Sequence, residues 1–397
     1  MKNVLVLGGG TGGTLAANLL ARRLAKQIRE GRASVMLLSD STEHVFQPAN
    51  LEVAFHGADP SKYVRKQQSL LKGNVKFLAE KAERISLQDR KVVTDTGREI
   101  DYEYVVIATG SVADPSLTPG LAESSYNFHT GPWNAAKIWN ALNRFERGKV
   151  VLVIAGVPHK CPPAPTEAMF LLDDYFRKRG IREKVELTFL TPYPHAYPAK
   201  PIAEVVEPLL EKRNVNVMTF FNIDGVDPAK GRVYSMEGDE VGYDLLIAVP
   251  PHRGSPVAIA SEIGDREGWI PADKHTMQVK DYDDAFAVGD ATNIPISKSG
   301  VVAHLQAGIV AHNVASMVLG VDGLKRYNGR INCPLEVGGG KALFVSGTYT
   351  RPPSPMQPTR IRYWMKKSFA SLYWQMLKGR LEPLFDLYFR EENGDGS

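Results

Sequence analysis

A short apolar run at the start of the chain leads directly into a glycine turn, and this feature constrains the fold most. Residues 3–7, NVLVL, are typical of a fully buried parallel strand. They precede Gly8, Gly10 and Gly13 in G-x-G-x-x-G spacing, and TLAANLLARRLAKQI continues with helical periodicity. A second apolar run, SVMLLSD, ends on Asp40. This β-α-β unit predicts a dinucleotide site, in which the glycines admit a pyrophosphate at the helix N-terminus and the acid binds a ribose.

Two later segments end in a similar turn after a predicted strand. DYEYVVIATGS ends at Thr109 and Gly110, and DDAFAVGDAT reaches Gly289 and Asp290. One glycine turn alone is weak support for a cofactor site, but three segments in this order resemble the flavoprotein disulfide reductase superfamily. The resemblance implies that the first loop binds the pyrophosphate of FAD and that the Asp290 carboxylate binds its ribityl chain.

A second βαβ unit begins at KVVLVIAG, residues 149–156, with later strands at KVELTFLT and YDLLIAVP. Superfamily members that use a nicotinamide cofactor carry a second glycine loop at this point. Here the sequence is GVPHKC, which keeps only Gly156. Prolines lack the N–H groups that bind a phosphate, and side chains obstruct the approach of the backbone. We therefore expect this unit to keep the Rossmann fold and to have lost NAD(P)H binding.

The chain has two cysteines, Cys161 and Cys333, which are too few for a disulfide framework or a four-ligand zinc site. His159 and Lys160 precede Cys161. A neighbouring positive charge favours a thiolate, so we expect Cys161 to be a reactive sulfur held in a rigid, proline-rich loop. The alternative is a small apolar side chain that fills a gap in the core.

A more specific resemblance comes from HKCPPAPTEA together with YNGRINCPLEVGGGKALFVSG. These segments resemble sulfide:quinone oxidoreductases and the related flavin subunit of flavocytochrome c sulfide dehydrogenase, and the resemblance extends over essentially the whole chain. It implies that Cys161 and Cys333 capture sulfide and carry a growing polysulfide, and that a flavin passes the electrons to a membrane quinone. It also assigns Pro48, in VFQPAN, and Ala82 to FAD binding. Many members carry a third cysteine near residues 126–134, which this chain lacks, so we expect non-covalent FAD.

Three histidines are candidate proton carriers. We select His129 and His195 because unperturbed histidine titrates near physiological pH. The alternative is that both are ordinary loop residues. His304 stands in a helix where many relatives carry a glutamate, and we expect it to relay a proton to the quinone. Lys341 and Phe344, in GGKALF, match family positions beside the quinone, with an ordinary strand and a surface lysine as the alternative.

The tail carries six bases and no acid between Thr359 and Arg380. Apolar residues recur there every three or four positions, which predicts a basic amphipathic helix. We expect this helix to anchor the chain on an anionic membrane, and its removal to leave flavin reduction by sulfide intact. Packing against the core is the alternative.

Composition and hydrophobic patterning together predict an α/β fold of two Rossmann-like domains. The 397 residues, 43% of them hydrophobic, allow several cores. We expect an FAD-binding domain over 1–115 and 275–330, a second Rossmann-like domain over 116–274, and a quinone and membrane region over 331–397. A net charge of +4 gives no reason to expect nucleic-acid binding, and self-association stays open. The sequence has neither a signal-peptide pattern nor a run of about 18 apolar residues, so we expect a peripheral membrane protein.

Three other functions are compatible with this fold. A flavocytochrome c type sulfide dehydrogenase passes electrons to a haem subunit and is disfavoured by the amphipathic tail and the lack of an export signal. A type II NADH:quinone oxidoreductase is disfavoured by the lost second glycine loop. The third alternative is a flavin-bearing electron-transfer partner with inert cysteines.

Overall fold

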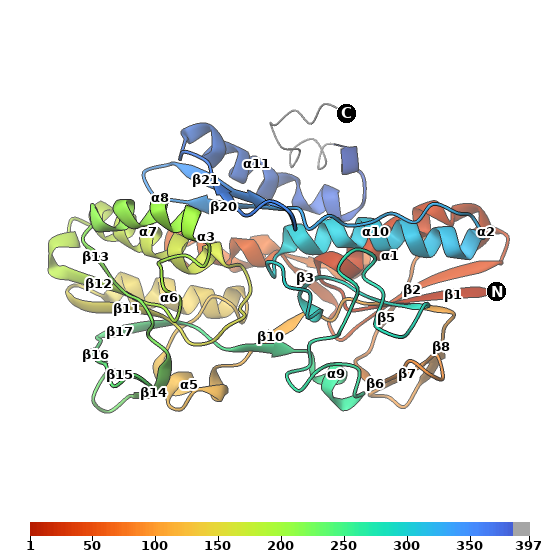
Figure 1. Cartoon of the computed structure of the whole chain (residues 1–397), viewed down its shortest axis with the longest axis horizontal. Coiled ribbons are helices and arrows are strands. Elements are labelled where there is room, and N and C mark those ends of the chain that lie inside the picture. Colours follow the sequence, from red (N-terminus) through yellow and green to blue (C-terminus); the bar gives the residue numbers. More distant parts are fainter. Residues whose placement is uncertain (384–397) are drawn as a thin grey trace.

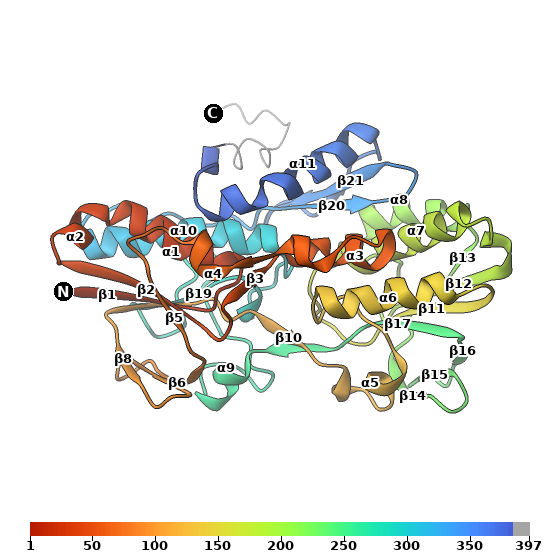
Figure 2. The same cartoon turned by 180° about the vertical axis from the view of Figure 1, so that it is seen from behind.

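Two parallel β-sheets lie side by side, and a smaller C-terminal layer covers both of them (Figures 1 and 2). The computed structural model describes residues 1–383. The predicted C-terminal region of 331–397 therefore ends, over its last 14 positions (384–397), outside the described residues. The α/β class is confirmed by both sheets.

The first sheet has the strand order β19-β9-β1-β2-β5, all parallel. Helix α1 (Thr11–Arg23) connects β1 to β2, so the strand, helix and strand predicted from the opening sequence are confirmed. The strands are β1 Lys2–Leu7, β2 Ala33–Ser39, β5 Lys76–Ala79, β9 Tyr104–Ile107 and β19 Ala285–Ala287. Around them lie α2 Ala25–Arg29, β3 Glu43–Val45, β4 Val64–Lys66 and α4 Gln67–Leu70.

Helix α10 (Gly300–Leu319) packs against α1 (Figure 1). It is long and apolar enough to cross a membrane by length and composition. Most of it is nevertheless buried inside the protein, as in Val302, Ala307 and Val314, which share a core with the first sheet. We therefore assign α10 as the core helix of this unit.

A three-stranded antiparallel sheet lies beside the first unit, formed by β6 Ala82–Ser86, β7 Lys91–Thr94 and β8 Glu99–Asp101. Helix α9 (Pro256–Ala260) packs on β6. Val257, Ala258 and Ile270 belong to the same core as Leu5 of β1. The predicted boundary at residue 275 therefore comes too late, because the chain already returns to the first unit near residue 256. The other boundaries stay predictions.

The second sheet has the order β13-β12-β11-β17 and is also parallel. Its strands are β11 Gly148–Ile154, β12 Val185–Leu190, β13 Val215–Met218 and β17 Leu245–Val249, with helices α6 Pro132–Arg144, α7 Pro163–Lys178 and α8 Lys200–Glu211. An antiparallel meander (β14 Ile223–Asp227, β15 Arg232–Ser235, β16 Glu240–Gly242) and α5 Leu121–Ser124 complete the unit.

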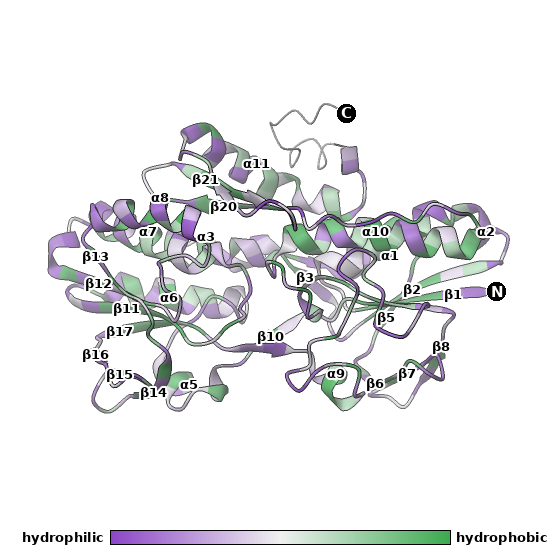
Figure 3. Ribbon diagram, viewed as in Figure 1, coloured by the Kyte–Doolittle hydropathy of each residue, from purple (hydrophilic) through white to green (hydrophobic). Residues whose placement is uncertain are grey.

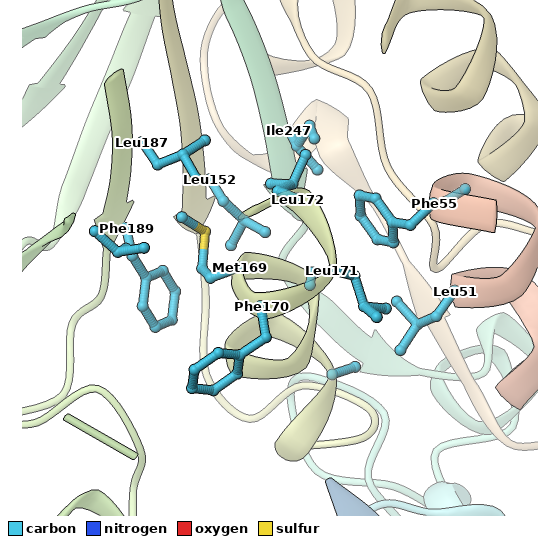
Figure 4. Close-up of a cluster of buried hydrophobic side chains, with 14 of the residues drawn as sticks. Leu51, Phe55, Leu152, Met169, Phe170, Leu171, Leu172, Leu187, Phe189 and Ile247 are labelled. Atoms are coloured by element: carbon cyan, nitrogen blue, oxygen red, sulfur yellow. The ribbon is translucent and has the colours of Figure 1, made fainter. Parts of the chain in front are cut away.

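Two features join the units. Strands β10 (Ser111–Ala113) and β18 (His252–Gly254) pair where the chain crosses between the sheets (Figure 2). Helix α3 (Asn50–His56) comes from the first unit but packs in the second, where Leu51 and Phe55 lie beside α7 (Figure 4). Shared apolar packing of this kind fixes how the two units sit together.

The C-terminal layer consists of a small antiparallel sheet and one long helix. The strands are β20 Ile331–Glu336, β21 Ala342–Gly347 and β22 Ser354–Pro355, and the helix is α11 Arg360–Leu377. β20 packs on α7, and α11 packs on β21. Figure 3 shows mixed hydrophilic and hydrophobic residues along α11, in contrast to the largely hydrophobic central strands.

Candidate active site

The glycine turn after β1 is the first part of the candidate dinucleotide site. Gly8 has φ = 99°, and a side chain there would collide with the carbonyl of Ala108. Gly13 lies so close to the Gly8 carbonyl that only glycine fits. Gly10, the N-cap of α1, has open space in front of it, and Asp40 is exposed just after β2. This arrangement leaves room for a pyrophosphate at the helix N-terminus.

The turn after β19 provides the second part of this site. The N–H of Gly289 donates to Oε1 of Gln306 at 2.7 Å, which fixes the turn. The buried Oδ1 of Asp290 has no hydrogen-bond partner among the described residues. A buried carboxylate oxygen needs a donor, and the hydroxyls of a ribityl chain are suitable donors. Burial raises the pKa of Asp290, and Lys160 and Lys298 oppose the shift.

The remaining predicted cofactor residues lie around the same sheet edge. The hydroxyl of Thr109 is 2.9 Å from that of Ser255, and Gly110 has φ = 67° with open space beside it. Pro48 is exposed in the short turn Gln47–Ala49. Ala82 is half-buried at the start of β6, shortly after the end of β5. The residues present therefore fit FAD.

The two cysteines are held by adjacent residues. The N–H of Cys161, which has φ = 53°, donates to the carbonyl of Lys298 at 2.7 Å. Sγ of Cys333 donates to Oγ of Ser299 at 3.6 Å. Both residues are free thiols and pack in one apolar cluster. The fold thus brings together two sulfurs from distant parts of the sequence, just before α10.

The prediction that His159 and Lys160 supply the positive charge at Cys161 is wrong. Burial raises the pKa of both thiols. Burial also lowers the pKa of His159 to about 4, so its imidazole is neutral at physiological pH. Nζ of Lys160 points to Oε1 of Gln47, 3.4 Å away. The cation that favours the Cys161 thiolate is instead Lys366, from α11.

The N-terminus of α7 explains the loss of the second nucleotide loop. Pro162, Pro163 and Pro165 have no N–H, and the N–H of Ala164 donates to the carbonyl of Cys161 at 2.9 Å. The first turn therefore offers no free donors of the kind that bind a pyrophosphate. Gly156 is kept for packing, because a side chain there would come within 2.9 Å of Pro251.

The histidines behave differently from the expectation. His129 is buried, with Nε2 3.2 Å from the carbonyl of Lys160 and its ring 5.2 Å from that of His252. Burial lowers the pKa of His129 well below 6.5, so the idea that it titrates near physiological pH is wrong. His195 is half-buried, with Nδ1 3.6 Å from Oε1 of Glu207. Sequence reasoning named His159 only as a charge beside Cys161 and did not select His252, although each follows the end of a buried parallel strand.

The three predicted quinone residues come from different elements of the fold. His304 is buried in α10, with Nε2 3.3 Å from Oε1 of Glu382. Lys341 is exposed in the turn between β20 and β21. Phe344 is buried opposite Pro334, whereas Cys333 is opposite Val345. Because side chains alternate along a strand, Phe344 and Cys333 point to opposite faces of this small sheet.

The bases in the middle of α11 point into the protein. Nζ of Lys366 pairs with Glu167 of α7 and lies 3.2 Å from Glu336 of β20. Lys367 pairs with Glu52 of α3. The expectation that these lysines face a membrane is therefore wrong. Sequence reasoning also missed the two acids, although Glu167 follows Cys161 by six positions and Glu336 follows Cys333 by three.

The glycine loop, the unpaired Asp290 oxygen and the adjoining thiols define an oxidoreductase built on two dinucleotide-binding folds. Residues 2–309 match the pyridine nucleotide-disulphide oxidoreductase family. The chain is 30% identical to the mitochondrial sulfide:quinone oxidoreductase of Mus musculus, covering 94% of this chain and 86% of the relative. It is therefore an enzyme of the sulfide:quinone oxidoreductase family.

Two further comparisons agree with this assignment. The chain is 28% identical to the sulfide-quinone reductase of Aquifex aeolicus, covering 97% of this chain and 93% of the relative. The X-ray structure of the Aquifex aeolicus sulfide:quinone oxidoreductase superposes with a TM-score of 0.87 at 22% identity, covering 100% of this chain and 99% of that one. The fold of the described residues is thus shared, including the C-terminal layer.

Proposed function

We propose that this chain oxidises sulfide at Cys161 and Cys333, with non-covalent FAD as its cofactor, and delivers the electrons to a membrane quinone. The observation that carries the proposal is that both cysteines are hydrogen-bonded to the segment between the Asp290 turn and α10. The backbone N–H of Cys161 donates to the carbonyl of Lys298, and the thiol of Cys333 donates to Ser299. These two hydrogen bonds support the proposal, because Lys298 and Ser299 follow the turn of Asp290, a residue that suits FAD. When bound, FAD supplies an acceptor for two electrons.

The residues that would hold FAD come from separate parts of the first unit. The glycine turn and the N-terminus of α1 suit the pyrophosphate, Asp40 a ribose and Asp290 the ribityl chain. The full set is Gly8, Gly10, Gly13, Asp40, Pro48, Ala82, Thr109, Gly110, Gly289 and Asp290. Residues 126–134 contain no cysteine that would bind the flavin covalently.

In this proposal the two cysteines react directly with sulfide. In the oxidised pair, attack by HS⁻ breaks the bond between the cysteines, forming a persulfide on one and leaving a thiolate on the other. Two electrons and the proton of the persulfide must then leave before the sulfur chain can grow or be released. The apolar cluster that contains Cys333, and against which the half-buried Cys161 packs, limits the access of bulk water to these reactive species.

Sulfide is favoured over NADH as the electron donor by the prolines of α7. Pro162, which is the N-cap, and Pro163 and Pro165 in the first turn lack the N–H groups that a nicotinamide dinucleotide would need there. This observation argues against the type II NADH:quinone oxidoreductase reading.

Membrane association is supported by the first turns of α11. Ile361 and Trp364 are 74% and 65% exposed, which is unusual for large apolar side chains. Trp is typical of the interface between water and lipid. A lipid-facing surface suits a quinone acceptor better than a haem subunit, and we assign the chain as a peripheral membrane protein. Lys341, Phe344 and His304 stay predicted contributors to the quinone half-reaction.

Anaerobic stopped-flow measurement of flavin absorbance tests the proposal. We expect sulfide to bleach the flavin and an added quinone to restore its colour, while NADH bleaches it at least tenfold more slowly. Equal or faster bleaching by NADH would overturn the assignment. Acid should release free FAD, and flavin that stays with the denatured chain would refute non-covalent binding.

A further inference from the structure

We propose that Lys298 is a positioning residue that joins the loop carrying Cys161 to the turn of Asp290, and that this connection sets the rate at which electrons pass from sulfur to FAD. The inference rests on the proposed function, because it concerns the electron-transfer step of that same half-reaction. It assigns a role to the side chain of Lys298, whereas the proposed function involves only its backbone carbonyl.

The side chain of Lys298 binds the turn that follows β19. Its Nζ donates to the carbonyl of Thr292 at 2.8 Å and to that of Asp290 at 3.3 Å. Both carbonyls belong to the turn whose carboxylate suits the ribityl chain of FAD. Lys298 is only 8% exposed, and hydrogen bonds are stronger in such a buried setting than in water. The lysine side chain therefore holds this turn firmly.

The backbone of Lys298 binds the cysteine loop at the same time. Its carbonyl accepts the N–H of Cys161 at 2.7 Å, and Lys160 and Lys298 form a short parallel bridge. On the other side of the same peptide unit, the carbonyl of Lys160 is 3.0 Å from Nδ1 of His159 and 3.2 Å from Nε2 of His129. The peptide unit before Cys161 is therefore held at its N–H and at its carbonyl.

The backbone conformation of Cys161 depends on these contacts. Its φ of 53° lies in the left-handed region, which is unfavourable for a residue with a side chain. Such a conformation persists only where the surrounding structure holds it, and the hydrogen bond to Lys298 is one of the contacts that do so. The direction of the Cys161 side chain is thus linked to the position of Lys298.

The indole ring of Trp269 fixes the place of the lysine ammonium. Nζ of Lys298 is 3.8 Å from the ring centroid, within the range of a cation–π contact. Trp269 is itself buried, and the N–H of the next residue, Ile270, donates to the carbonyl of Ala291 at 2.9 Å. Burial lowers the pKa of Lys298 to about 8 and Asp290 opposes that shift, so the ammonium is mostly protonated at pH 7.

Sulfide capture and electron transfer depend on this connection to different degrees. Attack of HS⁻ on the cysteine pair involves only sulfur atoms. Transfer of two electrons to FAD needs the sulfur and the cofactor in a fixed relation, and a displacement of about 1 Å can slow a reaction roughly 100-fold. A loosened connection therefore lowers the limiting rate and leaves the half-saturating sulfide concentration nearly unchanged. A purely structural role would instead lower FAD content and the thermal midpoint, and the protein that stays folded would keep both kinetic values.

Anaerobic flavin reduction over a range of sulfide concentrations, in the full-length FAD-loaded protein, tests this separation. We expect Lys298→Met to lower the limiting rate by roughly tenfold or more and to change the half-saturating concentration by less than about threefold. Lys298→Arg keeps the charge and the donors and should recover part of the rate. Lys274→Met is the matched control and should behave as the wild type, because Lys274 is an exposed lysine with Nζ 5.1 Å from the ring centroid of Tyr349.

Hydrogen–deuterium exchange measured by mass spectrometry tests the connection without turnover. Segment 157–165 contains four prolines, so the N–H of Cys161 is one of its few exchangeable amides. We expect Lys298→Met to accelerate exchange in this segment and in segment 288–293, because the Lys298 carbonyl is no longer tied to the Asp290 turn. Exchange in β12, which lies in the second sheet, should stay unchanged.

Two results would refute the positioning role. One is a wild-type limiting rate and wild-type exchange in Lys298→Met, and the other is a raised half-saturating concentration with an unchanged limiting rate. If Lys298→Met does not retain FAD, Trp269→Leu carries the same test, since it keeps the lysine and removes the ring, and Trp269→Phe should restore the rate. Wild-type protein that sulfide cannot reduce would instead refute the proposed function, and the exchange measurement would still test the connection.

Discussion

The hydroxyl of Tyr373, near the C-terminal end of α11, lies 2.7 Å from Nε2 of His44. The same hydroxyl is 2.8 Å from Oγ1 of Thr11, the first residue of α1, and Nδ1 of His44 is 2.7 Å from the carbonyl of Gly9. A carbonyl only accepts, so Nδ1 carries the proton and Nε2 accepts from Tyr373. The C-terminal helix is thus hydrogen-bonded, through two side chains, to the glycine loop at the opposite end of the sequence.

Tyr373→Phe should therefore weaken both folding and FAD binding. The change leaves the buried Nε2 of His44 without its donor, which costs about 1–3 kcal/mol. We expect a lower urea midpoint and faster loss of FAD on dilution. Tyr363→Phe, on the same helix, is the control and should change neither quantity. Unchanged stability and FAD retention in Tyr373→Phe would contradict the connection between α11 and the glycine loop.

This connection also changes the expectation for removal of the tail. A chain cut before Thr359 loses the hydrogen bond through which Tyr373 is connected to the glycine loop. It also leaves the buried carboxylates of Glu167 and Glu336 without Lys366. Buried carboxylates without a partner are strongly destabilising. The sequence predicts a separable tail because amphipathic spacing gives the period of an apolar face but not the partner of each polar residue.

Local patterns in the sequence were sufficient to predict the glycine turn and to select the two cysteines as candidates. A strand, a glycine turn and a helix are adjacent in sequence, so Gly8, Gly10 and Gly13 were assignable without a fold. Cys161 and Cys333 were paired by resemblance, and the fold brings both of them to Lys298 and Ser299.

Properties that depend on burial and long-range pairing were not predictable in the same way. Adjacent residues suggested a positive charge from His159 and Lys160 at Cys161, but burial neutralises the imidazole and the relevant cation comes from Lys366. His129 was selected for an unperturbed pKa that its buried position does not permit. Both errors come from applying solution values to groups whose solvent exposure is set by tertiary packing.

Cys161→Ser and Cys333→Ser should each abolish sulfide-driven quinone reduction while FAD stays bound. Each sulfur is proposed to carry substrate, and the residues that suit FAD lie elsewhere. The measurements are turnover with a soluble quinone and the ratio of flavin to protein. Ser299→Ala serves as a comparison, because it removes the partner of Cys333 but keeps both sulfurs, and it should retain measurable turnover. Near-normal turnover in either cysteine variant would return that residue to a packing role.

The buried histidines predict a loss of stability in mild acid. Burial lowers the pKa of His44 and His159 to about 4 and that of His252 to about 3, whereas the unfolded chain titrates near 6.5. Between these values the unfolded state binds more protons, so the free energy of unfolding rises with pH. The contribution is complete above about pH 6.5 and is lost toward pH 4, at up to about 1.4 kcal/mol per pH unit for each histidine.

Urea unfolding between pH 4.5 and 7.5 measures this slope. His252→Asn keeps a donor for the carbonyl of Pro250, which Nδ1 of His252 contacts at 2.7 Å, and should flatten the dependence by about one proton. His56→Asn, at an exposed position, should leave the slope unchanged. Identical slopes in His252→Asn and the wild type would show that His252 does not stay neutral in the folded protein.

Membrane binding should depend on Ile361 and Trp364 and not on the lysines that the sequence pattern indicated. We expect the double variant Ile361→Ser/Trp364→Ser to weaken binding to anionic liposomes by roughly tenfold or more, since it removes two large exposed apolar groups. Phe220→Ser/Met236→Ser is the matched control, because these side chains are 60% and 72% exposed and flank strands of the meander, which lies on the opposite side of the molecule from α11 (Figure 1). Sedimentation with liposomes measures both. Equal losses in the two double variants would mean that general surface hydrophobicity, and not the start of α11, determines attachment to the membrane.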